Sequence, residues 1–193
     1  MTGVFIRSNR GLIALLLAAF VTATLMGGSS LAGEWDKYKP KYSIGSESTD
    51  WWAAHPDQSA VAGSSTDHPK WVLDALEKKP ILIMDHTTDC SSCKIQEANV
   101  KKLLPSYSKE ITYYDLLADG KDKRAFEILD TYNPTGGEQF VPTTVFITLI
   151  KGSDGNVTVA WHSEIDAMTE KQLSAYLKDA IYYYRQNADD WSQ

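Results

Sequence analysis

Cys90 and Cys93 are the only two cysteines of this 193-residue chain, and two serines separate them. They lie between a short apolar run at residues 81–84 and a pattern typical of a helix at residues 94–104. A thiol at the N-terminus of a helix lies near unpaired backbone N–H groups and the positive end of the helix dipole. Both stabilise the thiolate, which is the nucleophile in disulfide exchange. The spacing therefore indicates reversible redox chemistry.

The N-terminus has the composition of a secretory signal. Arg7 and Arg10 precede an apolar run at residues 12–26, and small residues follow up to residue 33. This order predicts that residues 1–33 are a signal peptide or an uncleaved N-terminal anchor. The apolar run is shorter than the ~20 residues that cross a bilayer comfortably, so cleavage is favoured over a membrane tether through residues 12–26. We expect the protein to be secreted or extracytoplasmic.

The charge of the chain argues against two classes of partner. Loss of residues 1–33 removes two arginines and no acidic residue, which changes the formal net charge from −6 to −8. Nucleic-acid binding depends largely on neutralising phosphates, so an acidic chain is poorly suited to it. Binding to anionic lipid by charge alone is disfavoured for the same reason.

An extracytoplasmic location raises the alternative that the two cysteines form an inert structural disulfide. The loop that such a disulfide closes contains only two residues. Cross-linking so short a loop removes little entropy from the unfolded chain, so the gain in stability is small. A redox-active pair is therefore the favoured interpretation.

Residues 34–67 precede the regular part of the chain and contain Trp35, Trp51 and Trp52. Large aromatic side chains usually bury against other groups, which argues against a simple linker. We favour a strap laid over the domain surface, and a segment that docks a partner is the alternative.

From residue 67 the sequence alternates between helical and strand-like patterns. The last helix opens with a capping box at Thr169 and Gln172. This order predicts a mixed sheet with helices on both faces. The predicted elements are a helix ended by Pro80, a strand at 81–85, the cysteine helix kinked or ended near Pro105, a strand at 111–116, a helix at 121–132 with Ala125, Phe126, Leu129 and Tyr132 on one side, strands at 140–150 and 157–161, and a final helix.

With the cysteine pair at a strand–helix junction and Val141-Pro142-Thr143 before a predicted β-hairpin, the chain resembles the thioredoxin-fold family of thiol–disulfide oxidoreductases. The resemblance covers residues 68–187 and leaves 34–67 as an extension and 188–193 as a tail. It implies an α/β thioredoxin-like fold in which Cys90 attacks and Cys93 resolves the mixed disulfide. It also implies that Pro142 is cis and faces the disulfide, with the backbone of Val141 available to an extended substrate segment.

The chain departs from this family at two positions. The aspartate that the family places six residues before the first cysteine is replaced by Met84, and the usual tryptophan beside that cysteine by Asp89. Asp85 would point to the other side of the sheet, where a strand-end acid near solvent or a helix cap is as good a hypothesis as a catalytic role. Asp89 opposes formation of the Cys90 thiolate, whereas Lys94 and the helix dipole favour it.

The dipeptide between the cysteines tunes the redox potential in this family. Here it is Ser91-Ser92, which does not match the pairs of common thioredoxins or of strong oxidants. Because no histidine between the thiols stabilises the reduced form, we favour a reductase or isomerase over an oxidase.

Two other functions compete with this hypothesis. His86 could join Cys90 and Cys93 in a copper or zinc metallochaperone, with His68 or His162 as a fourth ligand. A histidine that tunes a nearby thiol is the simpler interpretation. The third hypothesis is an adaptor in which the cysteine pair is vestigial and the tryptophan-rich segment binds a partner.

The sequence thus predicts an extracytoplasmic thiol–disulfide oxidoreductase that reduces, isomerises or forms disulfides in protein substrates. Cys90 and Cys93 are its candidate catalytic residues, Val141 and Pro142 position the substrate, and Asp85, His86, Asp89 and Lys94 are candidate tuning residues. We expect no organic cofactor or metal, and a separate redox partner to reset the pair.

Overall fold

The computed structural model describes residues 35–192. The predicted signal or anchor, residues 1–33, lies outside the described residues. The chain divides into two compact units, of which the second begins at Lys39 and holds the sheet and helices described below. Within residues 35–192, no helix combines the length and apolar character that a membrane span requires.

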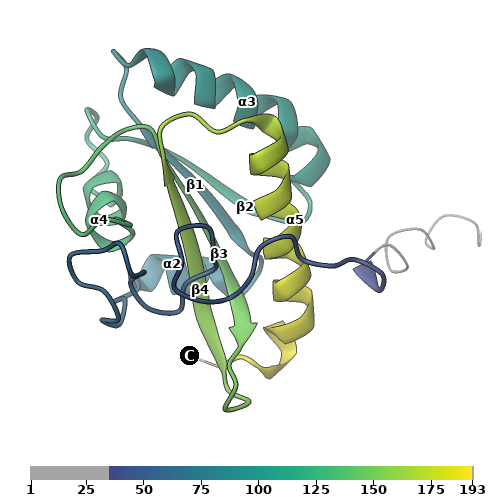
Figure 1. Cartoon of the computed structure of the whole chain (residues 1–193). Coiled ribbons are helices and arrows are strands. Elements are labelled where there is room, and N and C mark those ends of the chain that lie inside the picture. Colours follow the sequence, from purple (N-terminus) through teal and green to yellow (C-terminus); the bar gives the residue numbers. More distant parts are fainter. Residues whose placement is uncertain (1–34, 193) are drawn as a thin grey trace, which may run out of the picture. The chain divides into compact units, whose positions relative to one another are not determined.

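A four-stranded mixed sheet forms the centre of this unit, in the order β2-β1-β3-β4 (Figure 1). The first two strands run parallel, which requires a crossover, and the helix that begins at the cysteines provides it. The third strand is antiparallel to both of its neighbours. The strands are β1 (Ile81–His86), β2 (Thr112–Leu117), β3 (Thr143–Lys151) and β4 (Val157–Ile165).

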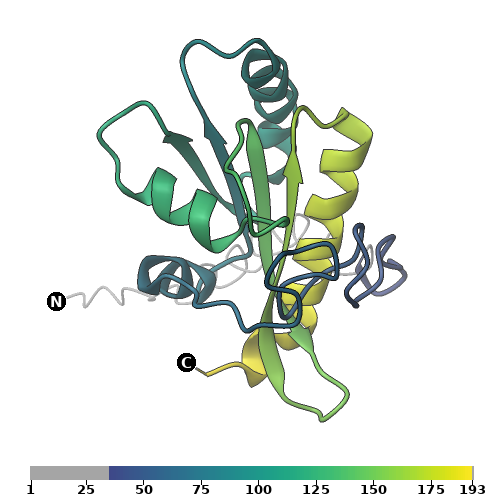
Figure 2. The ribbon, with the colours of Figure 1, turned by 60° about the vertical axis from the view of Figure 1, so that its left-hand side comes forward.

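Helices cover both faces of the sheet (Figure 2). α3 and α5 pack on one face, where α5 lies against β3, and α2 and α4 pack on the other. This strand order, with its parallel crossover and its antiparallel hairpin, is a thioredoxin-like fold, as predicted. The helices are α2 (Lys70–Leu76), α3 (Ser91–Tyr107), α4 (Arg124–Thr131) and α5 (Glu170–Asn187), followed by the short 3-10 helix η1 (Ala188–Asp190).

The order of the elements agrees with the prediction from residue 70 onward. The capping box is confirmed, because the Thr169 hydroxyl accepts from the Gln172 N–H and the Gln172 side chain accepts from the Thr169 N–H. α3 continues to Tyr107 with Pro105 inside it, and β4 extends to Ile165, past the predicted end at residue 161.

The predicted buried side of α4 is wrong at Phe126, whose side chain is 56% exposed. The buried side instead contains Ala125, Ile128, Leu129 and Tyr132. These positions recur at the three- and four-residue spacing that aligns side chains on one face of a helix. Phe126 follows Ala125 directly and is therefore rotated about 100° away from that face.

Residues 39–67 belong to the same compact unit as the sheet. Trp51 and Trp52 are fully buried, and Trp52 exchanges two backbone hydrogen bonds of 2.9 Å with Trp161 at the free edge of β4. The carboxylate of Asp179 on α5 accepts hydrogen bonds from the N–H groups of Lys41 and Tyr42. The segment assigned to an extension thus supplies core side chains and covers a sheet edge that would otherwise be open.

Candidate active site

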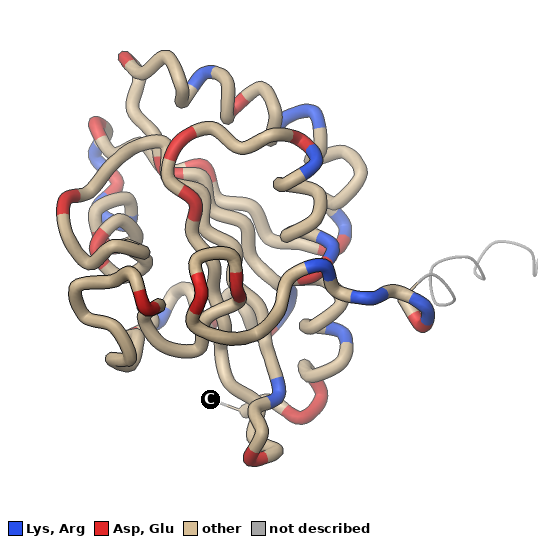
Figure 3. The backbone as a smooth tube through the Cα atoms, viewed as in Figure 1, with Lys and Arg blue, Asp and Glu red and all other residues tan. Residues whose placement is uncertain are grey.

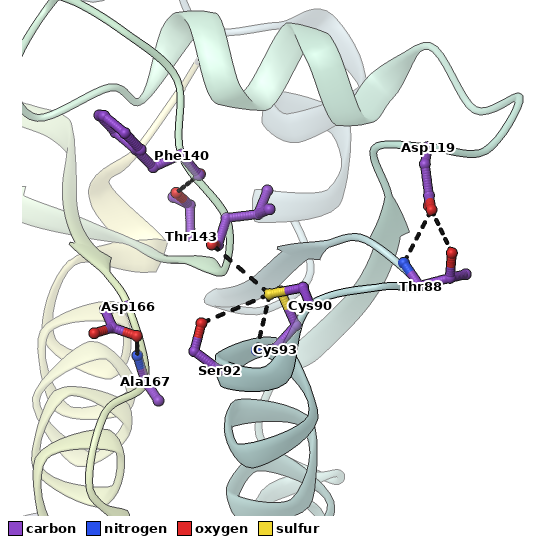
Figure 4. The surroundings of a disulfide bond; sticks show 10 residues. Thr88, Cys90, Ser92, Cys93, Asp119, Phe140, Thr143, Asp166 and Ala167 are labelled. Carbon is purple, nitrogen blue, oxygen red and sulfur yellow. Dashed lines mark hydrogen bonds between the residues drawn. A yellow bond between two sulfur atoms is a disulfide. The ribbon is translucent and has the colours of Figure 1, made fainter.

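Cys90 and Cys93 form a disulfide at the N-terminus of α3, with their Cα atoms 5.2 Å apart (Figure 4). β1 ends at His86, and three loop residues connect it to Cys90. β1, which is buried from Ile81 to Asp85, fixes one end of this loop, and the packed helix fixes the other. The pair therefore lies at the edge of the sheet, where two rigid elements hold it in place.

Cys90 is the N-cap of α3. Its backbone is extended, with φ −135° and ψ 117°, and its sulfur accepts a hydrogen bond from the Cys93 N–H at 3.1 Å. The sulfur thus takes the role of the serine or aspartate oxygen that usually satisfies such an N–H group. A thiolate at this position gains both that hydrogen bond and the favourable end of the helix dipole.

The two cysteines differ in their exposure to solvent. Cys90 is half-buried, whereas Cys93 is only 1% exposed. Cys90 is therefore the more accessible cysteine of the pair. This arrangement suits Cys90 as the attacking thiol and Cys93 as the resolving thiol.

The segment before β3 lies against the disulfide. The Val141 carbonyl oxygen is 3.9 Å from the Cys90 sulfur, and the Val141–Pro142 peptide bond is cis. The Pro142 carbonyl accepts a hydrogen bond from the Asp166 N–H at 2.9 Å, and the Thr143 hydroxyl donates to the Phe140 carbonyl at 2.7 Å. The structure thus brings Val141 and Pro142 together with the cysteine pair and fixes both sides of the proline.

Asp85 is fully buried on the sheet face opposite α3. It continues the alternation of Ile81 and Ile83, which contribute to the core beneath α2 and α4. Neither carboxylate oxygen has a hydrogen-bond partner of normal geometry. Burial raises the pKa of this carboxyl to about 8, and the N–H of His86 offsets the rise only in part. The hypothesis of a solvent-facing acid or helix cap is therefore wrong, because Asp85 is fully buried and Cys90 is the residue that caps α3.

His86 lies beside Asp115 of β2, where its Nε2 is 3.0 Å from a carboxylate oxygen. His68 bonds the Tyr132 hydroxyl, and His162 lies between the Asp50 carbonyl and Glu164. No group of three or more His, Cys, Asp or Glu side chains that could hold a metal ion exists within residues 35–192.

The remaining candidate tuning residues lie on the surface beside the pair. Asp89 is exposed and precedes Cys90, and Lys94 is exposed in the first turns of α3. Charges of both signs follow along this helix (Figure 3), including an ion pair between Glu97 and Lys101. The charged residues of α3 are three lysines (Lys94, Lys101 and Lys102) and one acidic residue, Glu97.

One contact beside the cysteines could not be found by sequence reasoning. The N–H and the hydroxyl of Thr88 both donate to one carboxylate oxygen of Asp119, which lowers the pKa of Asp119 (Figure 4). This contact ties the loop before Cys90 to the loop between β2 and α4. The two residues are 31 positions apart, and neither belongs to a recognisable motif.

A second set of contacts fixes α3 to the rest of the site. The buried amide of Gln96 donates to the Thr144 hydroxyl at 2.6 Å and accepts from the Met168 N–H at 2.8 Å. Asn99, one turn later, donates to the Met168 carbonyl at 2.8 Å. The cysteine helix is therefore connected both to β3, just after Pro142, and to the loop that leads into α5.

The sequence matches no family model, and no protein with a curated description matches it. Among solved structures, the chain is similar to a thioredoxin of Malassezia sympodialis, with 18% identity and a TM-score of 0.41 over 58% of this chain and 86% of that one. It is similar to mitochondrial thioredoxin 3 of Saccharomyces cerevisiae in its oxidised form, with 20% identity and a TM-score of 0.39 over 57% and 87%. A chloroplastic thioredoxin z gives 11% identity and a TM-score of 0.39 over 56% and 85%. The assignment of the fold rests on the strand order and connectivity described above.

Proposed function

We propose that this chain is a thiol–disulfide oxidoreductase that acts on protein substrates outside the cytoplasm. The observation that carries the proposal is the asymmetry of the cysteine pair. Cys90 is half-buried and caps α3 with its sulfur, which accepts a hydrogen bond from the Cys93 N–H, while Cys93 is buried. An inert disulfide needs neither the helix N-terminus nor one accessible sulfur.

The reaction proceeds in two exchanges. In the reduced protein, the Cys90 thiolate attacks one sulfur of a substrate disulfide, whose other sulfur leaves as a thiolate and takes a proton. Cys93 then loses its proton and attacks the Cys90 sulfur, which releases the second substrate thiol and forms the Cys90–Cys93 disulfide. Two electrons pass from the pair to the substrate, and a dithiol partner must return them. An oxidase runs the same steps in reverse.

The backbone beside the disulfide supports an extended protein substrate. Val141 is half-buried, and its carbonyl oxygen lies 3.9 Å from the sulfur that would join the substrate. A substrate segment that pairs with Val141 would bring its own cysteine onto Cys90 by strand addition. The exposed side chain of Phe140, two residues before Pro142, adds apolar surface at the same edge.

The location and the direction of electron flow belong to the same proposal. The signal-like composition of residues 1–33 supports export, and the absence of histidine between the cysteines supports a reductase or isomerase. The redox centre is the cysteine pair itself, so neither an organic cofactor nor a metal enters these steps. Mass measurement of the protein recovered after export would show whether residues 1–33 are removed.

Turnover of a protein disulfide tests the activity. We expect the reduced protein to reduce insulin or a model peptide disulfide, and Cys90→Ser to abolish this reaction. Full turnover by Cys90→Ser would refute the role of that thiol. Metal analysis after purification under reducing conditions provides an independent check, because a stoichiometric, tightly held copper or zinc ion would overturn the proposal in favour of a metallochaperone.

A further inference from the structure

We propose that the Ser92 hydroxyl donates a hydrogen bond to the Cys90 thiolate. This bond increases the acidity of the Cys90 thiol and raises the reduction potential of the pair. The inference rests on the proposed function, because it names a further catalytic residue in that reaction. It also distinguishes the two serines between the cysteines. Of these two, only Ser92 contacts the reacting sulfur.

The Cys90 sulfur has three polar neighbours among the described residues. The Cys93 N–H lies at 3.1 Å, the Ser92 Oγ at 3.6 Å and the Val141 carbonyl oxygen at 3.9 Å. Figure 4 shows the Ser92 side chain turned toward this sulfur from the first turn of α3. Apart from the disulfide, the attacking atom is thus surrounded by one backbone donor, one hydroxyl and one backbone acceptor.

These neighbours act in opposite directions once the disulfide is reduced. A thiolate has no proton and can only accept, so only the Cys93 N–H and the Ser92 O–H can stabilise it. A carbonyl oxygen can only accept, so Val141 interacts favourably with the protonated thiol and not with the thiolate. Without Ser92, the Cys93 N–H would favour the thiolate and the Val141 carbonyl oxygen would favour the protonated thiol. The Ser92 hydroxyl adds a second donor and therefore favours the thiolate.

The hydroxyl of Ser92 is free to make this contact. It has no other hydrogen-bond partner in the described part of the chain, and its proton can rotate toward the sulfur. Ser92 is half-buried, which limits competition from water, whereas Ser91 is exposed. No hydrogen bond joins Ser91 to either sulfur within residues 35–192, although its side chain is chemically identical.

Ser91 therefore provides a matched control for Ser92. Replacing either serine with alanine removes one hydroxyl from the same turn and leaves the Cys93 N–H in place. The donor stabilises the reduced thiolate, so Ser92→Ala should make the reduced form less favourable and the protein a stronger reductant. We expect the ionisation constant of the Cys90 thiol to fall about tenfold and the reduction potential by about 30 mV.

The experiment measures both quantities in the purified protein. The pH dependence of iodoacetamide alkylation, in a Cys93→Ala background, gives the ionisation of Cys90, and equilibration with glutathione buffers gives the potential of the two-cysteine forms. We expect Ser91→Ala to stay within about twofold of the parent and Ser92→Thr, which retains a hydroxyl, to restore most of the effect.

Equal ionisation in Ser92→Ala and Ser91→Ala would overturn the inference, whether both match the parent or both shift together. The outcome is separate from that of the proposed function. If the parent protein fails to reduce insulin but Ser92→Ala still lowers the ionisation constant alone, the hydrogen bond stands and the proposed activity does not. If insulin is reduced and the two alanine variants are alike, the activity stands and the role of Ser92 does not.

Discussion

The backbone N–H of Cys93 donates a hydrogen bond to the sulfur of Cys90 at 3.1 Å. In the proposed reaction, the residue whose thiol resolves the mixed disulfide therefore also holds the thiol that attacks first. Its two roles use different atoms, since the N–H belongs to the backbone and the resolving sulfur to the side chain. Substitutions at Cys93 can separate them.

Cys93→Ala and Cys93→Pro should differ in the reactivity of Cys90. Both remove the resolving thiol, so a mixed disulfide with substrate should accumulate. Only proline also removes the N–H, and Cys93 lies in the first turn of α3, where no carbonyl of the helix accepts from that N–H. We expect alkylation of Cys90 near neutral pH to be about tenfold slower in Cys93→Pro, because a hydrogen bond to a charged group is worth ~1.5–3 kcal/mol. The measurement is the pH profile of the alkylation rate.

Superimposable pH profiles for the two Cys93 variants would mean that the N–H does not stabilise the thiolate. Circular dichroism provides the control, because both variants must retain the helical signal of the parent. Turnover of insulin should be lost in both.

Asp85 should make the stability of the protein depend on pH. Its folded-state pKa is raised from 3.8 to about 8, so the folded chain binds a proton that the unfolded chain releases. The stability from this group is complete below about pH 4 and is lost as the pH rises through about 8, with a slope of up to ~1.4 kcal/mol per pH unit. We expect Asp85→Asn to flatten the loss, as measured by urea unfolding between pH 4.5 and pH 9.

The control for Asp85 is Asp130→Asn, which neutralises an exposed carboxylate on α4. Its stability should follow the parent at every pH. The assignment fails if the parent and Asp85→Asn give parallel curves, since the buried carboxyl would then not bind the extra proton.

Asp85 and Asp119 mark the limits of prediction from the sequence. The two-residue period of β1 places Asp85 on the face opposite Met84, but it does not tell whether helices cover that face at the end of the strand. The contact of Asp119 with Thr88 joins two loops that come together only after the sheet has formed. By contrast, the cysteine pair and the strand–helix order depend on local patterns, and these could be recognised.

Trp51 and Trp52 were recognisable as residues that need burial, but not as part of the core. Their packing depends on Trp161 and His162 of β4, more than 100 residues later. Phe126 shows the opposite error. It is apolar and adjoins the buried side of α4, so the sequence predicts its burial, but the residue is exposed. Aromatic residues indicate that a surface is covered, and only the fold identifies which surface.

The contact between Asp119 and Thr88 should order the loop that leads to Cys90. Asp119→Ala removes the acceptor of both the Thr88 N–H and its hydroxyl, so hydrogen exchange of the Thr88 amide should become faster. Thr88 and Asp119 are exposed, so global stability should change little. The hydrogen bonds from Thr88 lower the pKa of Asp119, so their contribution is present above its ordinary pKa of 3.8 and is lost as the pH falls. Unchanged exchange of the Thr88 amide near neutral pH would contradict this role.

Trp52→Ala tests whether residues 39–67 are an integral part of the domain. The Trp52 side chain is fully buried, donates from its indole N–H to the Glu47 carbonyl at 2.8 Å and packs edge-on against Trp161 with ring centroids 4.9 Å apart. Removing a buried aromatic ring typically costs about 3–5 kcal/mol, so we expect a loss of that size in urea unfolding. Val61→Ala, in the same segment but 46% exposed, should stay within about 0.5 kcal/mol of the parent. If Trp52→Ala were as stable as Val61→Ala, residues 39–67 would be a removable strap. We expect instead that the sheet does not fold stably without this segment, because Trp52 makes two backbone hydrogen bonds to Trp161 and buries its indole ring.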